Sequence, residues 1–294
     1  MLHGSILAGL AAIPAALQAL GRNAAPVRGV LARVCRPAHH RPVPLIADPW
    51  FYALAIPAFL LNGISKGSFA SGAGNLSVPV MAMVIPAPQA VGIALPVLCV
   101  MDVAGLRAWW GRWSTREMRA ILPAGLLGIV IGTLTFGLFS ARGISLMLGI
   151  LTLGFLARAL WQRASGRVPP PAAPNRLKAW FFGTASGFTS TLAHTGGPPL
   201  AMYLYPLKLD RQTLAATTTV VFGVVNYAKI LPFWGLGLLD WTNILTSLVL
   251  MPVAPIGVHL GIALQKRISD RSFYNFVYVL LGITGAKLVW DGLG

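Results

Sequence analysis

GFTSTLAHTGGPP, residues 187–199, is the segment around which the chain is built. It lies inside an apolar region, yet it combines hydroxyl side chains and a histidine with two glycines and two prolines. Pro198 and Pro199 cannot donate backbone hydrogen bonds, and the glycines weaken any helix that they interrupt. The pattern therefore predicts that a helix entering this stretch breaks within it. A second stretch, residues 63–79 (GISKGSFASGAGNLSVP), has the same character and adds Lys66.

The composition is typical of a polytopic membrane protein. Of the 294 residues, 56% are hydrophobic and 10% are charged, and the mean hydropathy is +0.71. A soluble domain is about a quarter charged. In hydrocarbon, the unpaired backbone groups of a broken helix are tolerated only where protein buries them or where they line a polar cavity. We therefore expect an all-α integral membrane protein in which two broken, re-entrant helices meet near the membrane midplane, as in secondary transporters.

The net charge of +16 raises the question of nucleic-acid binding, but the distribution of the basic residues argues against it. They lie mainly in short gaps between apolar runs, where the positive-inside rule places them. A nucleic-acid-binding protein carries them in a stripe on a soluble element. Cys35 and Cys99 are far apart and form no CxxC pair, so we expect no disulfide, metal site or cofactor. The expected partner is the lipid bilayer.

The first 47 residues form an extension of unusual composition. An apolar run at 6–20 precedes five arginines, whereas a signal peptide carries its basic residues before the apolar core. We interpret residues 1–47 as a poorly structured or interfacial extension. Asp48 and Pro49 then supply a carboxylate cap and a proline at the first helical position, which predicts a helix start.

Beyond this point, apolar runs predict helices at 76–86, 88–106, 116–139, 143–161 and 212–232. Ser114 and Glu117 have the spacing of a capping box before the third of these helices. This spacing gives Glu117 a structural role, with its side chain returning to the backbone of Ser114. The Pro-rich stretch at 163–176 contains arginines but no acid, and it predicts a linker between two halves.

The second half repeats the first at an offset of 120 residues. A Gly-x-x-x-Gly pair at 63 and 67 recurs at 183 and 187, and the prolines at 79 and 86 recur at 199 and 206. If the basic loops are cytoplasmic, the first half begins outside and the second begins inside. Two units of about five segments each and of opposite orientation form an inverted repeat. The predicted division is an extension (1–47), a first membrane repeat (48–162), a linker (163–176) and a second membrane repeat (177–294).

Lys66 is a candidate anion-binding residue. An ammonium at membrane depth costs ~2.5–3.5 kcal/mol, so a partner or a water-filled cavity is expected. The alternative is that Lys66 extends to the membrane interface from a helix end. Small and hydroxyl residues surround it, which favours the anion site. The Gly-x-x-x-Gly pairs have their own alternative role as helix-packing positions.

Other polar residues in the apolar region are further candidates for the site. His194 is either a hydrogen-bonded core residue, or a donor to an oxyanion and a proton carrier. Asn226 and Lys229 lie one turn apart in one predicted helix. Asp102 is either a proton or cation handle or a partner of Arg107, and we favour the pairing.

Motifs of common enzyme classes are absent. The chain has no G-x-x-x-x-G-K-[ST], and FASG around Ser71 lacks the first glycine of a nucleophile elbow, so a serine hydrolase built from Ser71 and His194 is disfavoured. A selective anion channel is the more serious alternative to a transporter, because pores also use lysines and hydroxyls.

Two long motifs resemble the TauE/SafE family of membrane anion exporters. They are GFTSTLAHTGGPPLAMYLYPLKLD at 187–210, followed by NYAKILPFWGLG at 226–237, and ISKGSFASGAGNLSVPVMAMVIPAPQAVGIALPVLCVMD at 64–102. The resemblance extends from about residue 50 to residue 293. It implies export of sulfite or transport of organosulfonates such as sulfoacetate. The family's site residues map here onto Ser65, Lys66, Gly67, His194, Gly196, Gly197, Pro198, Asn226 and Lys229.

The chain departs from this family in its extra polar groups. The first motif has Ser68, Ala70, Ser71 and Asn75 where the family is richer in glycine, and Thr195 replaces a commoner alanine. These hydroxyls and the amide fit an anion that is larger or more polar than sulfite.

The resulting hypothesis is a secondary transporter of small sulfur-containing anions in the bacterial inner membrane, working by alternating access. It requires no metal or cofactor, and a second copy of the chain in a homodimer is a further candidate partner. His194 and Asp102 are the candidates for proton coupling. The predicted substrate-binding residues are Ser65, Lys66, Gly67, Ser71, Asn75, Ser77, Thr191, His194, Thr195, Gly196, Gly197, Asn226 and Lys229.

Overall fold

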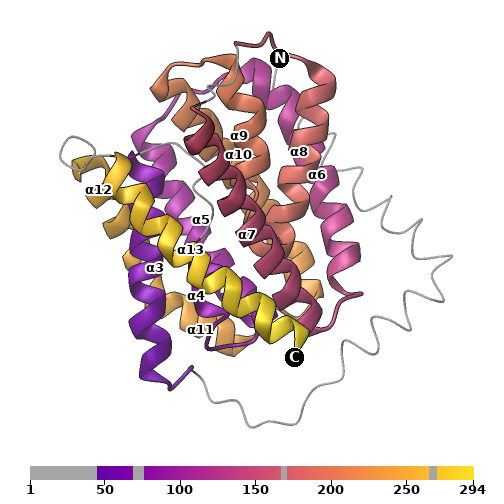
Figure 1. Ribbon diagram of the computed structural model, residues 1–294, viewed down its shortest axis with the longest axis vertical. Coiled ribbons are helices and arrows are strands. Elements are labelled where there is room, and N and C mark those ends of the chain that lie inside the picture. Colours follow the sequence, from indigo (N-terminus) through magenta and orange to yellow (C-terminus); the bar gives the residue numbers. More distant parts are fainter. Residues whose placement is uncertain (1–44, 69–75, 167–170, 265–269) are drawn as a thin grey trace, which may run out of the picture. The chain divides into compact units, whose positions relative to one another are not determined.

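The computed structural model describes residues 45–68, 76–166, 171–264 and 270–294 (Figure 1). These residues form helices and connecting turns, with no strand among them, which confirms the all-α prediction for this part of the chain. The N-terminal extension, apart from its last three residues, lies outside the described residues. So do Ser71 and Asn75.

The helices follow one another without other regular structure. Up to residue 166 they are α3 (Pro49–Ser68), α4 (Ser77–Met81), α5 (Ala87–Ala108), α6 (Thr115–Phe136) and α7 (Ala141–Ser165). After residue 171 they are α8 (Arg176–Ala193), α9 (Gly197–Leu204), the 3₁₀ turn η1 (Tyr205–Leu207), α10 (Arg211–Gly235), α11 (Trp241–Leu250), α12 (Val253–Leu264) and α13 (Asp270–Leu293).

Short polar side chains start most of the long helices. Asp48 Oδ1 accepts from Trp50 N at 2.9 Å, so α3 begins where the Asp-Pro pair predicts. Asn175, Asp210 and Asp240 cap α8, α10 and α11 in the same way. Each side-chain oxygen satisfies an amide that has no partner within its own helix.

Two of the predicted elements differ from the structure. The helix expected at 76–86 ends at Met81, and residues 82–84 form a turn. Pro86 explains the shorter helix, because proline disfavours helical backbone in the residue before it and itself starts α5 in an extended conformation. In contrast, α7 continues to Ser165, where Gly166 ends it with φ 57°.

The capping box before α6 is only half formed. Ser114 Oγ accepts from Glu117 N at 3.4 Å, but the backbone N–H of Ser114 donates to Thr217 Oγ1 at 2.9 Å. The carboxylate of Glu117 is buried and accepts from the hydroxyl of Tyr203 at 2.5 Å. The reciprocal bond predicted for Glu117 is therefore wrong, because a contact with α9 takes its place.

Five stretches of the described helices are long and apolar enough to cross a membrane. They are α5, α6, α7, residues 212–235 of α10, and residues 241–263, which include α11 and most of α12. Large apolar side chains such as Leu134 and Leu231 lie exposed on these helices, as lipid-facing residues do. The most enclosed of the five is α5, which packs against α4, α10, α11 and α12.

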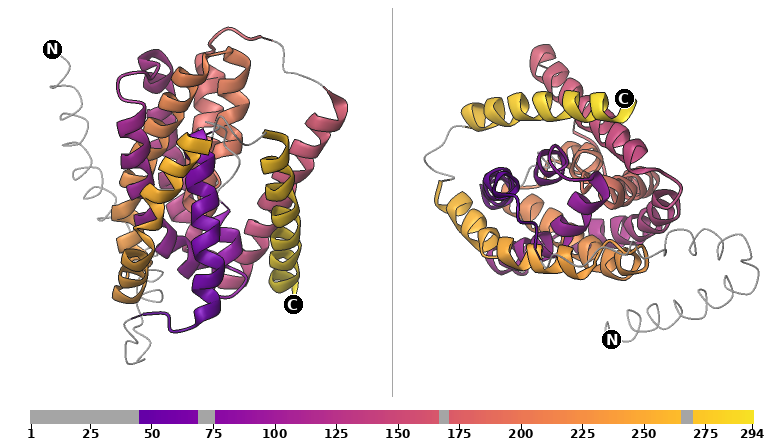
Figure 2. Two further views of the ribbon diagram at one scale, coloured as in Figure 1. Left: turned by 90° about the vertical axis from the view of Figure 1, so that its left-hand side faces the viewer. Right: turned by 90° about the horizontal axis from the view of Figure 1, so that it is seen from below.

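Glycines bring two pairs of helices into close contact (Figure 2). In α3, a Cβ on Gly67 would lie 2.3 Å from Val258 O in α12. In α8, a Cβ on Gly187 would lie 2.0 Å from Gly125 O in α6. Each Gly-x-x-x-Gly pair therefore acts as a helix-packing position, which is the alternative role that its spacing offered. The third close pair is α7 with α13.

Candidate functional site

The helix predicted to break in residues 187–199 does break there. The last residue of α8 is Ala193, and His194 follows in the left-handed region with φ 52° and ψ 23°. Its N–H donates to Ser190 O at 2.9 Å, and α9 begins at Gly197. The prolines after Gly197 lie in the first turn of α9, where they are tolerated. The turn itself therefore comes from a histidine, in a conformation that few non-glycine residues adopt.

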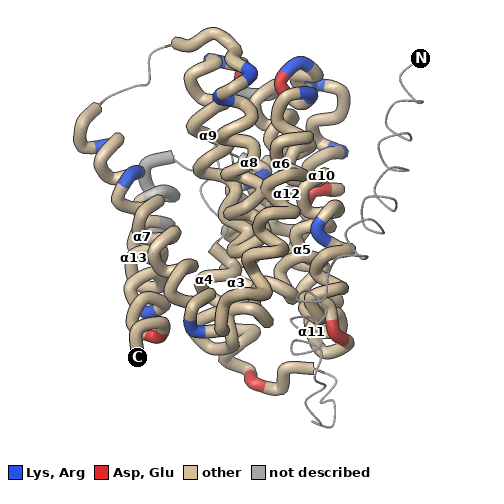
Figure 3. Tube along the Cα trace, turned by 90° about the vertical axis from the view of Figure 1, so that its right-hand side faces the viewer, with Lys and Arg blue, Asp and Glu red and all other residues tan. Residues whose placement is uncertain are grey.

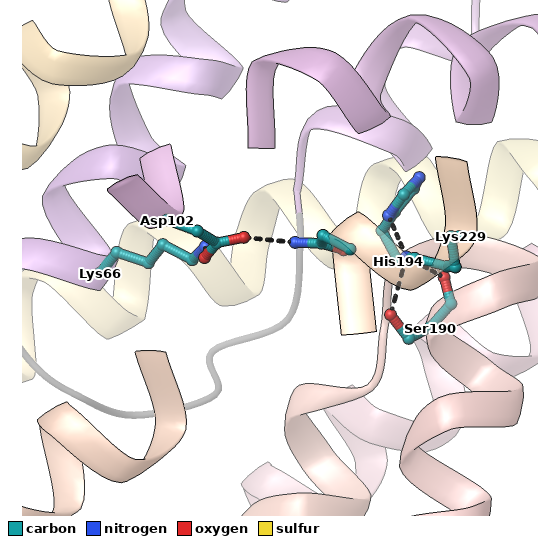
Figure 4. Close-up of polar contacts among 6 residues, drawn as sticks. Lys66, Asp102, Ser190, His194 and Lys229 are labelled. Carbon is teal, nitrogen blue, oxygen red and sulfur yellow. Dashed lines mark hydrogen bonds and ion pairs between the residues drawn. The ribbon is translucent and has the colours of Figure 1, made fainter. Parts of the chain in front are cut away.

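Lys229 of α10 reaches the end of α8. Its side chain is fully buried, and its Nζ lies 3.0 Å from Ser190 O, 3.0 Å from Ser190 Oγ and 2.8 Å from His194 Nδ1 (Figure 4). The Phe233 ring centroid is 5.7 Å from the same nitrogen. An ammonium carries three hydrogens, and three acceptors surround this one. The geometry therefore suits a protonated lysine with all its donors in use.

The second ring nitrogen of His194 fixes its tautomer. Nε2 lies 3.0 Å from the carbonyl oxygen of Val91 in α5. A carbonyl only accepts, so Nε2 carries the proton, and Nδ1 is then free to accept from Lys229. The histidine is thus a neutral imidazole that ties α5 and α10 to the break after α8.

A second group of polar contacts centres on Asp102 of α5. Its carboxylate, 2% exposed, forms an ion pair with Lys66 in the last turn of α3. Its other oxygen accepts from Asn226 Nδ2 at 2.6 Å. Of the two surroundings expected for Lys66, a partner or a water-filled cavity, the structure shows the partner. The preferred pairing of Asp102 with Arg107 is wrong, because five residues separate them by about 140° around the helix axis and Arg107 lies exposed.

One turn of α10 links the two groups, since Asn226 precedes Lys229 by three residues. Figure 4 shows Lys66 and Asp102 on one side, with His194, Lys229 and Ser190 gathered on the other. We call this set the two-lysine cluster: Lys66, Asp102, Ser190, His194, Asn226 and Lys229. With a neutral histidine, its two ammonium groups and one carboxylate leave one net positive charge inside the protein.

Several predicted site residues lie near the cluster without joining it. The hydroxyl of Thr191 donates to Gly187 O at 2.9 Å, and that of Thr195 to Thr189 O at 3.4 Å. The carbonyl of Gly196 accepts from Ser186 Oγ at 2.7 Å, and Gly197 opens α9. These groups bond within the segment around the break.

The first of the two predicted breaks, residues 63–79, is described at its two ends. Ser65 is buried in the last turn of α3, beside Gly67 at the contact with α12. Asn62 Nδ2 donates to Ser77 Oγ at 3.0 Å, and Asn62 Oδ1 accepts from Leu76 N at 2.9 Å. Asn62 therefore joins the end of α3 to the start of α4.

Two residues of this region were absent from the predicted set. Ser190 lies four residues before His194, one helical turn, so a search for polar neighbours on the same helix face finds it. Asn62 stands four residues before Lys66 in the same way. Among the described residues, no three His, Cys, Asp or Glu side chains lie close enough to hold a metal ion.

Comparison with known proteins agrees with the motifs. The model of the family described as Sulfite exporter TauE/SafE matches residues 55–288. The "Probable inner membrane transporter protein TsaS" of Comamonas testosteroni is 28% identical over 202 residues, which cover 67% of this chain and 80% of that protein. No solved structure matches. The chain therefore belongs to the TauE/SafE sulfite exporter family and is a multi-pass membrane protein.

Proposed function

We propose that the protein is a secondary transporter of small sulfur-containing anions, sulfite or organosulfonates such as sulfoacetate, and that the two-lysine cluster binds them. The observation that carries the proposal is Lys229, a fully buried lysine at a helix break whose hydrogen bonds are all with neutral acceptors. A charge without a counter-ion is costly in a low-dielectric interior, so a bound anion stabilises the cluster. The positive end of the helix dipole of α9 starts three residues after His194 and adds to the attraction.

In this proposal the two lysines supply charge and their neighbours supply hydrogen bonds. Ser65, Ser77 and the amides of Gly196 and Gly197 are the candidate donors among the described residues, and Gly67 holds the end of α3 against α12. Thr191 and Thr195 take part only if their bonds to backbone oxygens open. Ser71 and Asn75 remain proposed donors from the first broken segment.

The packing of the helices supports two inverted repeats, 48–162 and 177–294, joined by the linker 163–176. The first helix of the first half, α3, packs on α12 of the second, and the first helix of the second half, α8, packs on α6 of the first. In Figure 1, α3 begins at the lower end and α8 at the upper end. Alternating access then arises when one half tilts against the other around the cluster.

Two observations support a location in the inner membrane, namely the distribution of the basic residues and the name of the relative. In Figure 3, basic residues gather near the start of α8 and the end of α9, whereas the loop before α11 carries an acid. The positive-inside rule places the basic end in the cytoplasm. The relative's name supports the inner membrane. The homodimer stays a prediction.

Burial favours a carrier over a channel. Lys229 is fully buried and Asp102 is 2% exposed, so these two groups do not line a water-filled path. Reconstitution in liposomes separates the two functions, because a carrier gives saturable counterflow and a channel gives single-channel currents.

The proposal is tested by thermal stabilisation of the purified protein. Sulfite, thiosulfate, sulfoacetate, taurine and small carboxylates are compared, and at least one of the sulfur anions should raise the melting temperature. The shift should be lost in Lys66→Ala and kept in Lys178→Ala, which removes an exposed lysine. Wild-type protein that none of the sulfur anions stabilises contradicts the proposal.

A further inference from the structure

Lys66 already has a counter-ion in this structure. Its ammonium forms an ion pair with Asp102, whose carboxylate presents the same two-oxygen edge as part of a sulfonate. An anion that binds Lys66 therefore competes with Asp102 for one ammonium. The environment of Lys229 differs, because neutral acceptors surround its ammonium.

Among the described residues, Asp102 forms its ion pair with Lys66, and Lys229 lies one turn of α10 beyond its other partner, Asn226. Its remaining partner is the amide of Asn226, at 2.6 Å, and its side chain is 2% exposed. A buried carboxylate held by an amide alone is costly, and such groups become neutral by binding a proton. Neutral Asp102 keeps its bond from Asn226, because the second oxygen still accepts.

We propose that Asp102 is the resident counter-ion of Lys66, and that a substrate anion replaces it while the displaced carboxylate takes up one proton from water. This inference rests on the proposed function and specifies how that site couples to protons. When a dianion such as sulfoacetate arrives with one proton, one of its negative charges replaces that of Asp102 beside Lys66. Its other negative charge then offsets the net positive charge of the cluster.

The other titratable groups near Asp102 are less suited to this role. His194 uses one ring nitrogen for Val91 O and the other for Lys229. Cys99 lies one turn away on α5, and Tyr227 is half exposed on α10. Neither α4 nor α11 carries a titratable side chain, and His259 of α12 bonds to its own helix at Pro255 O. The titratable residues of α7 are exposed arginines: Arg142, Arg158 and Arg163.

The test is the binding of sulfoacetate by calorimetry in two buffers with different heats of ionisation. Sulfoacetate suits the test because neither of its acid groups titrates between about pH 6 and pH 8. Wild-type protein should take up one proton per sulfoacetate, and its Kd should rise with pH, by at most about tenfold per pH unit. Asp102→Asn should bind without proton uptake, with a Kd that does not depend on pH.

Asp102→Asn removes the carboxylate that competes with the ligand for Lys66. At about pH 8 this variant should therefore bind sulfoacetate roughly tenfold more tightly than the wild type does. Asp291→Asn is the matched control, because Asp291 pairs with Lys287 in an exposed i,i+4 ion pair and its loss should leave proton uptake intact. If Asp102→Asn fails to fold, wild-type protein that binds sulfoacetate without proton uptake still overturns the inference.

The outcomes separate the two proposals. Wild-type protein that binds sulfoacetate without proton uptake overturns the inference and leaves the proposed function standing. Proton uptake that persists in Asp102→Asn overturns it too, since the proton then binds elsewhere. Wild-type protein that binds none of sulfoacetate, thiosulfate and sulfite overturns the proposed function, and the inference with it.

Discussion

Lys66 and Lys229 carry the same charge in two different environments. Lys66 is 22% exposed and faces a carboxylate, whereas Lys229 is fully buried and faces two oxygens of Ser190 and a nitrogen of His194. An ion pair can exchange one anion for another. A lysine fixed by three neutral acceptors instead holds its surroundings in place. We therefore assign exchange of anions to Lys66, and support of the helix break to Lys229.

The largest effect is expected from Lys229→Met. The substitution leaves two buried acceptors at the end of α8, Ser190 Oγ and His194 Nδ1, without the donor they have now, each costing about 1–3 kcal/mol, whereas Ser190 O keeps its bond from His194 N–H. We expect a loss of about 2–5 kcal/mol in the free energy of unfolding together with loss of anion binding, measured by thermal melting and by titration. Lys178→Ala, on the exposed start of α8, serves as the control. A variant with wild-type melting temperature would remove the support role of Lys229.

Lys66 should behave differently because its partner can be removed with it. Lys66→Met strands the Asp102 carboxylate and should destabilise the protein, whereas Lys66→Met combined with Asp102→Asn should recover most of the loss. We expect a coupling energy of roughly 1–3 kcal/mol in this double-mutant cycle, measured by denaturation. Additive losses would mean that the ion pair contributes nothing and would erase the contrast with Lys229.

The two close helix contacts, α3 with α12 and α8 with α6, are expected to be about equally sensitive to substitution of their glycines. Gly187→Ala forces α8 away from Gly125 O, and Gly67→Ala forces α3 away from Val258 O, at the distances where a Cβ cannot fit. Each should cost about 1–3 kcal/mol of stability. Gly154→Ala in α7, with nothing within 4 Å of its Cβ, should cost nothing measurable. Equal stabilities of all three variants would show that close packing does not position the cluster.

The smallest effect is expected from Ser190→Ala. It removes one of the three acceptors of Lys229 and keeps the backbone oxygen of the same residue, so about 1 kcal/mol of stability should be lost. Ser145→Ala provides the matched control, because that exposed hydroxyl bonds only to Ala141 O of its own helix. A loss from Ser190→Ala as large as that from Lys229→Met would mean that the hydroxyl, not the ammonium, holds the break.

The sequence was a good guide where a local rule decides the outcome. Proline and glycine chemistry predicted the break in 187–199, and the Asp48-Pro49 pair predicted the start of α3, because both depend on backbone groups a few residues apart. The same reasoning failed for Glu117 and Asp102. Their partners, Tyr203 of α9 and Lys66 of α3, come from other helices, and only the packing of the helices decides which faces meet.

Counterflow in liposomes tests whether Lys66 binds the transported anion. Protein is reconstituted in liposomes loaded with the sulfur anion that stabilises it most, and uptake of the labelled anion is followed. We expect saturable counterflow for the wild type and for Lys178→Ala, and its loss in Lys66→Ala. Counterflow in Lys66→Ala at the wild-type rate would show that the cluster does not carry the anion.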